Sequence, residues 1–180
     1  MRIFQSRAKV LKTSHILLYM TPEESTPRQL LISYNEWEGM DSLPADDRAL
    51  LQAAVVALDG AYSPYSKFCV GAAVRLADGS IVTGSNQENI AYPSGLCAER
   101  TALFAAAHRY PEQPFTALAI VGRNAEGQLV PATPCGACRQ VMAEYEQRHR
   151  RSLHIILFIS VDKILTLDGV DSLLPFSFSM

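Results

Sequence analysis

Three cysteines stand where two helices are predicted to begin. Cys97 lies in L-C-A-E-R-T (96–101), and Cys135 and Cys138 lie in P-C-G-A-C-R-Q (134–140). The free N–H groups and the dipole of a helix N-terminus favour the thiolate, which is the form of cysteine that binds metal or attacks as a nucleophile. Because Cys138 follows Cys135 by one helical turn, both sulfurs are directed toward the same point. This spacing suits a tetrahedral zinc ion.

The C-G-A-C segment admits three interpretations. A strand followed by C-x-x-C and a helix is also the layout of a thioredoxin-like redox site, and the motif by itself fits redox and zinc chemistry equally well. Cys97 favours zinc, because a catalytic zinc needs three protein ligands and an open position, whereas a redox pair needs no third thiol. A structural zinc would require a fourth ligand, but Cys69, in a strand of small apolar residues, is expected to be a packed core thiol.

Glu99 is the candidate proton carrier. An acidic residue in the first turn of a helix ordinarily complements the helix dipole. Positions i and i+2 of a helix point in different directions, so Glu99 can approach a metal on Cys97 only if Cys97 lies at the helix boundary. From there the Glu99 carboxylate could take a proton from a water on the metal and act as general acid and base.

The hydrophobic pattern predicts the elements that hold these residues. In chain order we expect a helix from Pro44 to near Gly60, two strands joined by a turn at Asp78-Gly79, a helix over 97–110, a strand over 116–122, a helix from 136, and strands from 154 and 164. The strand–helix–strand unit over 116–160 predicts a right-handed parallel crossover. The sheet is therefore expected to be partly parallel and covered on both faces.

Length, composition and charge narrow the class of protein. The 180 residues suffice for one ordinary domain, and 48% hydrophobic with 19% charged residues exclude a disordered, collagen-like or coiled-coil chain. A net charge of -2 gives no general attraction to nucleic acid or anionic lipid. Four cysteines are too few and too uneven for a disulfide framework, and the apolar run 16–20 is too short for a membrane span. We expect a cytoplasmic protein with small-molecule partners.

The N-terminal part of the chain differs from the rest in charge. Residues 1–20 contain basic side chains and no acidic one, whereas 21–48 contain seven acids against Arg28 and Arg48. This asymmetry predicts an N-terminal extension or arm over 1–43 that carries no chemistry. A catalytic domain is expected over 44–180.

Four segments, in order along the chain, carry a resemblance to a known family. They are A-Y-S-P-Y-S-K-F-C-V-G-A-A (61–73), S-N-Q-E-N-I-A-Y-P-S-G-L-C-A-E-R-T-A (85–102), P-C-G-A-C-R-Q-V (134–141) and L-L-P-F-S-F (173–178). Over about residues 47–178 the chain resembles the small, three-cysteine, zinc-dependent cytidine deaminases. The resemblance implies an α/β fold, a three-layer α-β-α sandwich with a five-stranded mixed sheet. It also implies one zinc ion per chain and hydrolytic deamination of cytidine and deoxycytidine to uridine and deoxyuridine, with release of ammonia, in pyrimidine salvage.

The same resemblance assigns roles to individual residues, with Glu99 as the catalytic proton carrier. The implied zinc ligands are Cys97, Cys135 and Cys138. The implied nucleoside contacts are Phe68, Asn86, Glu88, Ala98 and Phe178, of which Asn86 and Glu88 bind the sugar hydroxyls and Phe178 enters the pocket of an adjacent subunit. Arg100 and Arg139 are expected to hydrogen-bond the thiolates and to offset the negative charge of the site. Because the family is commonly homotetrameric, we expect a homo-oligomer, a tetramer or otherwise a dimer.

The chain departs from the family pattern in two places. The segment before Pro44 has no counterpart in compact members, and Phe176 replaces a small residue. Subunit contacts are therefore expected to differ, while the base pocket is retained. Two other functions remain open: a related aminohydrolase for another cytosine nucleoside, such as blasticidin S, and a zinc or redox module without catalysis.

Overall fold

Seven strands form one mixed sheet in the part of the chain that the computed structural model describes, residues 27–179. Their spatial order is β1-β7-β6-β4-β2-β3, and β5 pairs with β4 outside this path. The strands are β1 (Asn35–Trp37), β2 (Cys69–Leu76), β3 (Ile81–Ser85), β4 (Phe115–Arg123), β5 (Leu129–Val130), β6 (His154–Ser160) and β7 (Lys163–Asp168). The α-helices are α1 (Ala45–Ala57), α2 (Ala98–Arg109) and α3 (Gly136–His149).

The expected count of five strands is wrong, since β1 and β5 were not predicted. β1 has three residues and β5 has two, which is too short for an alternating hydrophobic pattern to develop. The five predicted strands and three predicted helices are all present, with boundaries within a few residues of those expected. Among the described residues, none of the helices combines the length and apolar character needed to cross a bilayer.

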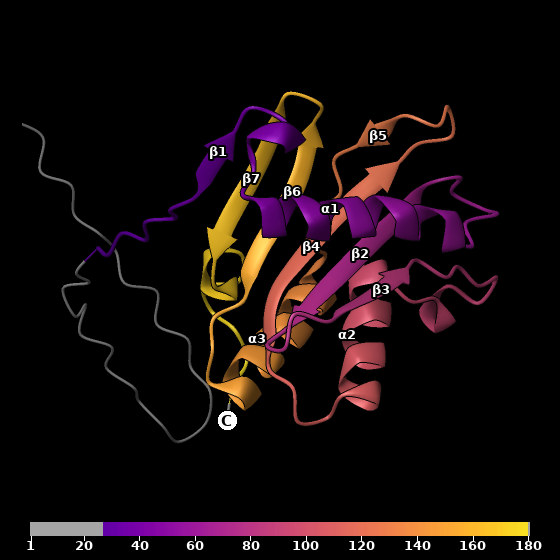
Figure 1. The fold of residues 1–180 in the computed structure, drawn as a ribbon. Coiled ribbons are helices and arrows are strands. Elements are labelled where there is room, and N and C mark those ends of the chain that lie inside the picture. Colours follow the sequence, from indigo (N-terminus) through magenta and orange to yellow (C-terminus); the bar gives the residue numbers. More distant parts are fainter. Residues whose placement is uncertain (1–26, 180) are drawn as a thin grey trace, which may run out of the picture. The chain divides into compact units, whose positions relative to one another are not determined.

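Helices pack on both faces of the sheet, with α1 on one face and α2 and α3 on the other (Figure 1). Neighbouring residues of β2 and β4 point to opposite faces, as the pleat of a strand requires. The residues buried on the α1 side include Leu50, Leu51, Ala54, Ala73, Ala117 and Ala119. Those buried on the α2 and α3 side include Val74, Leu103, Leu118, Ile120 and Met142. The small side chains of β2 and β4 let α1 lie close to the sheet.

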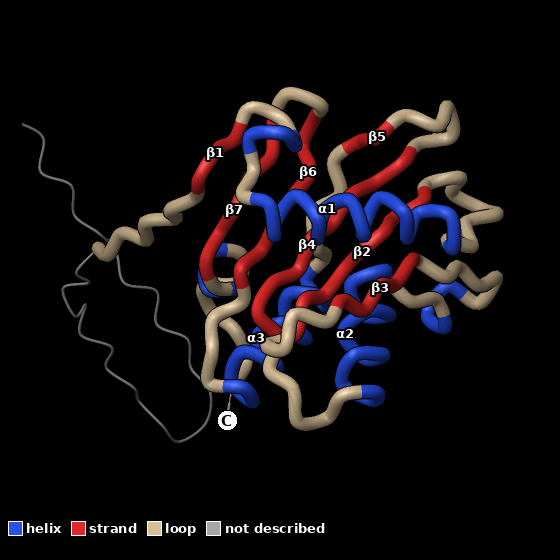
Figure 2. The backbone as a smooth tube through the Cα atoms, in the orientation of Figure 1, coloured by secondary structure: helices blue, strands red, loops and turns tan. Residues whose placement is uncertain are grey.

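The directions of β3 and β4 explain how two distant cysteine motifs meet. Both strands pair antiparallel with β2, so they run the same way and the chain leaves them at the same end of the sheet. From β3 the chain continues to Cys97 at the start of α2, and from β4 it continues through β5 to Cys135 at the start of α3. Parallel pairing of β4 with β6 confirms the predicted parallel crossover through α3 (Figure 2).

Two glycines allow other parts of the chain to pack closely against the sheet near the cysteines. A Cβ atom on Gly84 in β3 would lie 2.4 Å from the backbone nitrogen of Ala102, so only glycine lets α2 sit this near to the strand. A Cβ on Gly122 in β4 would lie 2.9 Å from Cζ of Phe68. Gly84 therefore sets the depth of the helix that follows Cys97, and Gly122 leaves room for the Phe68 ring.

Residues 35–43, which fall in the predicted extension, contact the sheet. β1 pairs antiparallel with β7, the Trp37 indole N–H donates to the Thr166 hydroxyl at 3.0 Å, and Leu43 is buried. The chain divides into units 1–31 and 32–180, so the unit that contains the sheet begins before Pro44. In the first unit only 27–31 are described, and they form no helix or strand. The basic segment 1–20 lies outside the described residues.

His149, the last residue of α3, makes the stability of the crossover sensitive to pH. Its Nδ1 accepts a hydrogen bond from the Phe115 backbone N–H at 3.2 Å, and its ring packs against Phe115 and Tyr145. Burial, together with the nearby Arg148, lowers the pKa of His149 below its usual value. An acceptor nitrogen cannot carry a proton, so the neutral ring is the form that the fold holds.

We predict that acid weakens this contact. The unfolded chain takes up a proton on His149 near pH 6.5, above the pKa of the folded state, so the contribution is complete above that pH and is lost below it. Between pH 7.5 and 5, the free energy of unfolding should fall by about 1 kcal/mol more in the parent than in His149→Gln. Urea denaturation of both proteins at several pH values measures the difference. Parallel pH curves would contradict the prediction.

Candidate active site

Cys97 and Cys135 occupy equivalent positions, each at the residue before a helix begins. Their backbones are extended, with φ/ψ of -72/152° and -68/166°, and their carbonyls accept the first helical hydrogen bonds at 3.0 Å. Cys97 therefore lies at the boundary of α2, outside helical geometry, as the sequence argument about Glu99 requires. Cys138 lies in the first turn of α3 and is buried.

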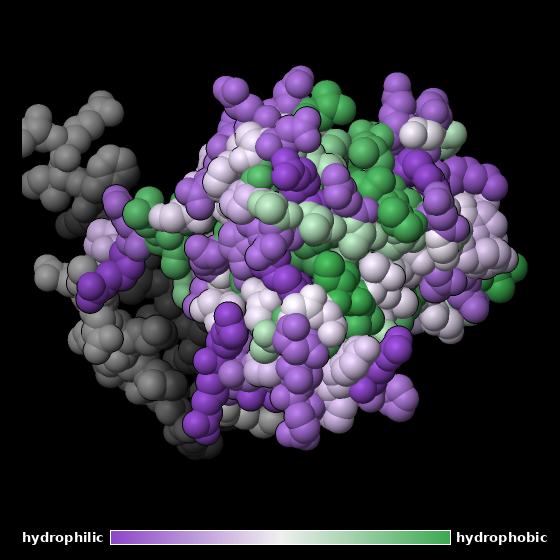
Figure 3. Space-filling view, viewed as in Figure 1, coloured by the Kyte–Doolittle hydropathy of each residue, from purple (hydrophilic) through white to green (hydrophobic). Residues whose placement is uncertain are grey.

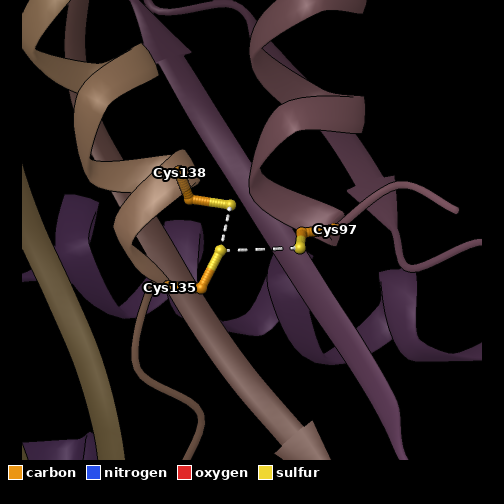
Figure 4. Close-up of side chains that lie close together, drawn as sticks. All are labelled: Cys97, Cys135 and Cys138. Carbon is orange, nitrogen blue, oxygen red and sulfur yellow. Dashed lines mark hydrogen bonds between the residues drawn. The ribbon is translucent and has the colours of Figure 1, made fainter. Parts of the chain in front are cut away.

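The three sulfurs converge in space. The Sγ atoms of Cys97 and Cys135 are 3.8 Å apart, those of Cys135 and Cys138 are 3.5 Å apart, and all three lie within 4.8 Å of one another (Figure 4). In a tetrahedral zinc site with Zn–S bonds of 2.3 Å, sulfurs lie about 3.8 Å apart. The spacing and the soft thiolate donors therefore fit one zinc ion per chain. All four cysteines of the chain are free, and Cys69 lies outside this cluster, half-buried beside Ser63 at 3.2 Å.

The surroundings of the three cysteines stabilise the ionised form of at least one of them. Hydrogen bonding from Cys138, opposed by burial and reinforced by Arg100, lowers the pKa of Cys97 to about 5. Arg100 Nη2 donates to Cys97 Sγ at 3.5 Å. The same arrangement raises the pKa of Cys138, because two adjacent sulfurs without a metal cannot both carry charge at low cost. A dication that joins all three sulfurs removes this conflict.

Glu99 lies in the first turn of α2 and is only 4% exposed. Burial raises the pKa of its carboxyl group, and the negative charge of Cys97 acts in the same direction. A carboxyl group with a raised pKa gives up its proton less readily than an exposed glutamate does. Glu99 is thus suited to carry protons beside the cysteine cluster.

A cavity of about 420 Å³ opens beside Glu99 and two of the cysteines. Its walls come from the segment before β2, the segment after β3, the start of α2 and the segment between β5 and α3. The lining residues are Ser66, Phe68, Val70, Asn86, Glu88, Cys97, Ala98, Glu99, Pro131, Ala132, Thr133 and Cys135. A volume of this size accommodates a small organic molecule.

Asn86 and Glu88 are polar residues of the cavity wall that are held by hydrogen bonds to the segment before β2. Asn86 accepts from the Val70 N–H at 2.7 Å and donates to the Phe68 carbonyl at 2.9 Å, which leaves one N–H and one lone pair of its amide unused by these contacts. Glu88 Oε2 accepts from the backbone N–H groups of Tyr65 and Ser66 at 2.9 and 3.3 Å. Hydrogen bonding, first from the Ser66 side chain, lowers the pKa of Glu88. Glu88 is therefore an ionised acceptor on this wall.

Most of the residues predicted for the site lie together, but two do not. Arg139 contacts no sulfur; its guanidinium donates to the backbone carbonyls of Pro134 and Leu173 at 2.8 and 2.7 Å. Phe178 is 73% exposed and lines a different cavity, beside α3. The predicted nucleoside contacts Phe68, Ala98, Asn86 and Glu88 all line the cavity next to the cysteines.

Five residues that line the cavity were not predicted from the sequence. Ser66 and Val70 flank Phe68, and Pro131, Ala132 and Thr133 directly precede the P-C-G-A-C segment. None of these side chains has an ionisable group, so residue type alone gave no signal. Their adjacency to the two motifs was the available indication, because the segment that delivers Cys135 must also pass the metal site.

Comparison with known proteins supports the interpretation of these residues as a zinc-dependent active site. The family described as the cytidine and deoxycytidylate deaminase zinc-binding region matches residues 44–151 of this chain. The match spans more than half of the chain and includes the three cysteines and Glu99. The chain therefore belongs to the cytidine and deoxycytidylate deaminase family, and its α/β fold is that of the cytidine deaminases.

Individual relatives and solved structures support this assignment. The cytidine deaminase of Halalkalibacterium halodurans is 48% identical over 99 residues, which cover 55% of this chain and 71% of that protein. The cytidine deaminase of Sporosarcina psychrophila is 49% identical over 100 residues, 56% of this chain and 70% of that protein. The crystal structure of cytidine deaminase from Burkholderia pseudomallei has a TM-score of 0.61 at 42% identity and covers 72% of this chain and 97% of its own.

We predict that alanine at any one of Cys97, Cys135 and Cys138 removes the zinc, because two thiolates do not hold the ion against chelation. Elemental analysis of the purified proteins should give one zinc per chain for the parent and almost none for these variants. Cys69→Ala is the matched control, since Cys69 lies outside the cluster, and it should retain the metal. Full zinc occupancy in Cys135→Ala would show that the ligand set is wrong.

Proposed function

We propose that this chain catalyses the hydrolytic deamination of cytidine and deoxycytidine to uridine and deoxyuridine, as in pyrimidine salvage. The observation that supports this most is that the three-cysteine cluster and a buried carboxyl group, Glu99, border one cavity. The same cavity is lined by Asn86 and Glu88, whose polar groups suit a sugar. The names of the relatives point to the same reaction.

The roles of the metal-binding residues follow from their donor atoms. Cys97, Cys135 and Cys138 would hold the zinc ion. When bound, zinc supplies Lewis acidity that allows water to act as a nucleophile at neutral pH. Three thiolates outweigh the charge of the ion, so the Arg100 guanidinium, 3.5 Å from Cys97, reduces the excess of negative charge.

Glu99 moves the protons of the reaction. Its carboxylate takes a proton from the attacking water and delivers it to N3 of the pyrimidine, while the water oxygen forms a bond to C4. A second proton then passes through Glu99 to the exocyclic amine, the C4–N bond breaks, and ammonia leaves. Water and cytidine are consumed, uridine and ammonia are formed, and Glu99 returns to its starting state.

The polar and aromatic residues of the cavity wall would recognise the nucleoside. The spare N–H and lone pair of Asn86 and the ionised Glu88 can bond the sugar hydroxyls, because their other contacts hold them in place. Phe68 would pack against the nucleoside, and Gly122 gives its ring room. The net charge of -2 argues for a free nucleoside rather than a polymer, since polymer affinity depends on neutralising phosphates.

We also propose that the enzyme is a homo-oligomer, a tetramer or otherwise a dimer, in which Phe178 reaches the pocket of a neighbouring subunit. Phe176 and Phe178 are 93% and 73% exposed. On the face that carries α1, apolar side chains also gather along the helix (Figure 3), and Val56 is largely exposed. Exposed apolar groups of this kind favour burial against another subunit.

We further propose an N-terminal extension before a catalytic domain, and a cytoplasmic location. An N-terminal extension followed by a catalytic domain from Pro44 agrees with the range of the family match, although β1 joins the sheet from the extension. A cytoplasmic location is supported by four free cysteines, which a reducing compartment preserves.

The function is tested by following the ultraviolet absorbance of cytidine with the zinc-loaded protein. We expect cytidine and deoxycytidine to be converted with release of ammonia, and chelation to abolish the conversion. Blasticidin S and single-stranded DNA, tested in parallel, should react far more slowly. Turnover of blasticidin S with cytidine unchanged would favour the related aminohydrolase, and no ammonia from any substrate would favour a non-catalytic zinc module.

We predict that Glu99→Gln separates proton transfer from metal binding. The variant should retain zinc and fold but lose at least about 10³ in turnover, because one positioned acid/base contributes roughly 10² to 10⁴ and Glu99 serves several transfers. Glu126→Gln, an exposed glutamate in the loop between β4 and β5, is the matched control and should be fully active. A Glu99→Gln enzyme within tenfold of the parent would exclude Glu99 as the proton carrier.

A further inference from the structure

Two adjacent side chains of α3 hold the backbone of the C-terminal segment, residues 173–178. The Gln140 amide makes two hydrogen bonds to Phe178, donating from Nε2 to its carbonyl at 2.8 Å and accepting at Oε1 from its N–H at 3.1 Å. A two-point contact with one residue fixes its position and also the rotation of its backbone. At the other end of the segment, Arg139 donates to the Leu173 carbonyl at 2.7 Å.

Arg139 connects this segment to the loop that carries a cysteine ligand. The same guanidinium donates from Nε to the carbonyl of Pro134, the residue before Cys135, at 2.8 Å. Its planar set of donors therefore spans two backbone segments that are far apart in sequence. No contact between Arg139 and a sulfur competes with this role among the described residues.

The contacts hold backbone atoms and leave the aromatic rings free. Phe176 is 93% exposed and Phe178 is 73% exposed, although the Phe178 backbone is bonded at both of its polar groups. The cavity that Phe178 borders shares no lining residue with the cavity beside Glu99. Phe178 thus does not complete the active site of its own subunit, and its ring is presented outward.

We infer that Arg139 and Gln140 are positioning residues that set the direction of the C-terminal aromatic segment toward the nucleoside pocket of a neighbouring copy. The inference rests on the proposed function and replaces thiolate tuning as the role of Arg139. A segment already ordered on α3 loses little conformational freedom when its ring enters a pocket, which strengthens the contact. Because Arg139 and Gln140 directly follow Cys138, the first turns of α3 would both hold the metal and orient residues 173–178.

The main test compares Gln140→Ala, Gln140→Glu and the parent with cytidine as substrate. Gln140→Ala should raise KM about tenfold, leave kcat within about threefold, and retain full zinc and the parent melting temperature within a few degrees. Gln140→Glu keeps an acceptor for the Phe178 N–H but has no donor for its carbonyl, so its KM should lie between the two. Gln52→Ala, an exposed glutamine on α1, is the matched control and should equal the parent.

A double-mutant cycle separates aiming of the segment from a general structural effect. If Gln140 acts through Phe178, then Gln140→Ala should change kcat/KM by less than about twofold in a Phe178→Ala background. Independent effects of the two substitutions, or an unchanged KM in Gln140→Ala, would overturn the inference. Arg139→Gln should likewise raise KM with zinc content unchanged, and loss of zinc in this variant would restore a role at the thiolates.

A readout that does not use turnover distinguishes failure of this inference from failure of the proposed function. Carboxypeptidase digestion followed by mass spectrometry should release Phe178 several times faster from Gln140→Ala than from the parent. Equal rates would overturn the anchoring role whatever the substrate is. An inactive parent with a protected Phe178 would instead refute cytidine as the substrate, and with it the delivery of the segment to a cytidine pocket.

Discussion

The convergence of two helix N-termini at one end of the sheet is the constraint on which the site depends. β3 and β4 both run antiparallel to β2, so α2 and α3 begin near each other and their first residues bring three sulfurs within 4.8 Å. Helix dipoles favour negative charge at this point, and the extended backbones of Cys97 and Cys135 turn their side chains toward it. The metal site is therefore a consequence of strand direction as much as of cysteine spacing.

The pKa of the Cys97 thiol and that of the Glu99 carboxyl group are shifted in opposite directions by their surroundings. Hydrogen bonds from Cys138 and Arg100 outweigh burial and lower the pKa of the Cys97 thiol, whereas burial dominates at Glu99 and raises the pKa of its carboxyl group. An ionised thiolate suits a metal ligand, and a carboxyl group with a raised pKa suits proton transfer. These opposite properties arise within one turn of α2, which Gly84 allows to lie close against β3.

Much of the fold and the chemical centre could be predicted from the sequence, because long periodic segments and cysteine spacing carry strong local signals. The helix boundary at Cys97 followed from the requirement that Glu99 face the same metal. The short strands β1 and β5 gave no such signal. The partner of Arg139 depends on where residues 173–178 return to α3, and that contact bridges 34 positions in sequence. Local patterns do not contain such long-range information.

The strand β1 has a consequence for the exposed edge of the sheet. It occupies the side of β7 that would otherwise present unpaired N–H and C=O groups to other chains. β1 is itself a poor template for further strand addition, since it has only three residues and its Glu36 carboxylate is engaged by Lys163 at 3.0 Å. A shortened chain starting at Pro44 would uncover the longer β7, which contains Ile164, Leu165 and Leu167. Pairing of residues 35–37 with β7 therefore replaces a six-residue edge of the sheet by a three-residue one.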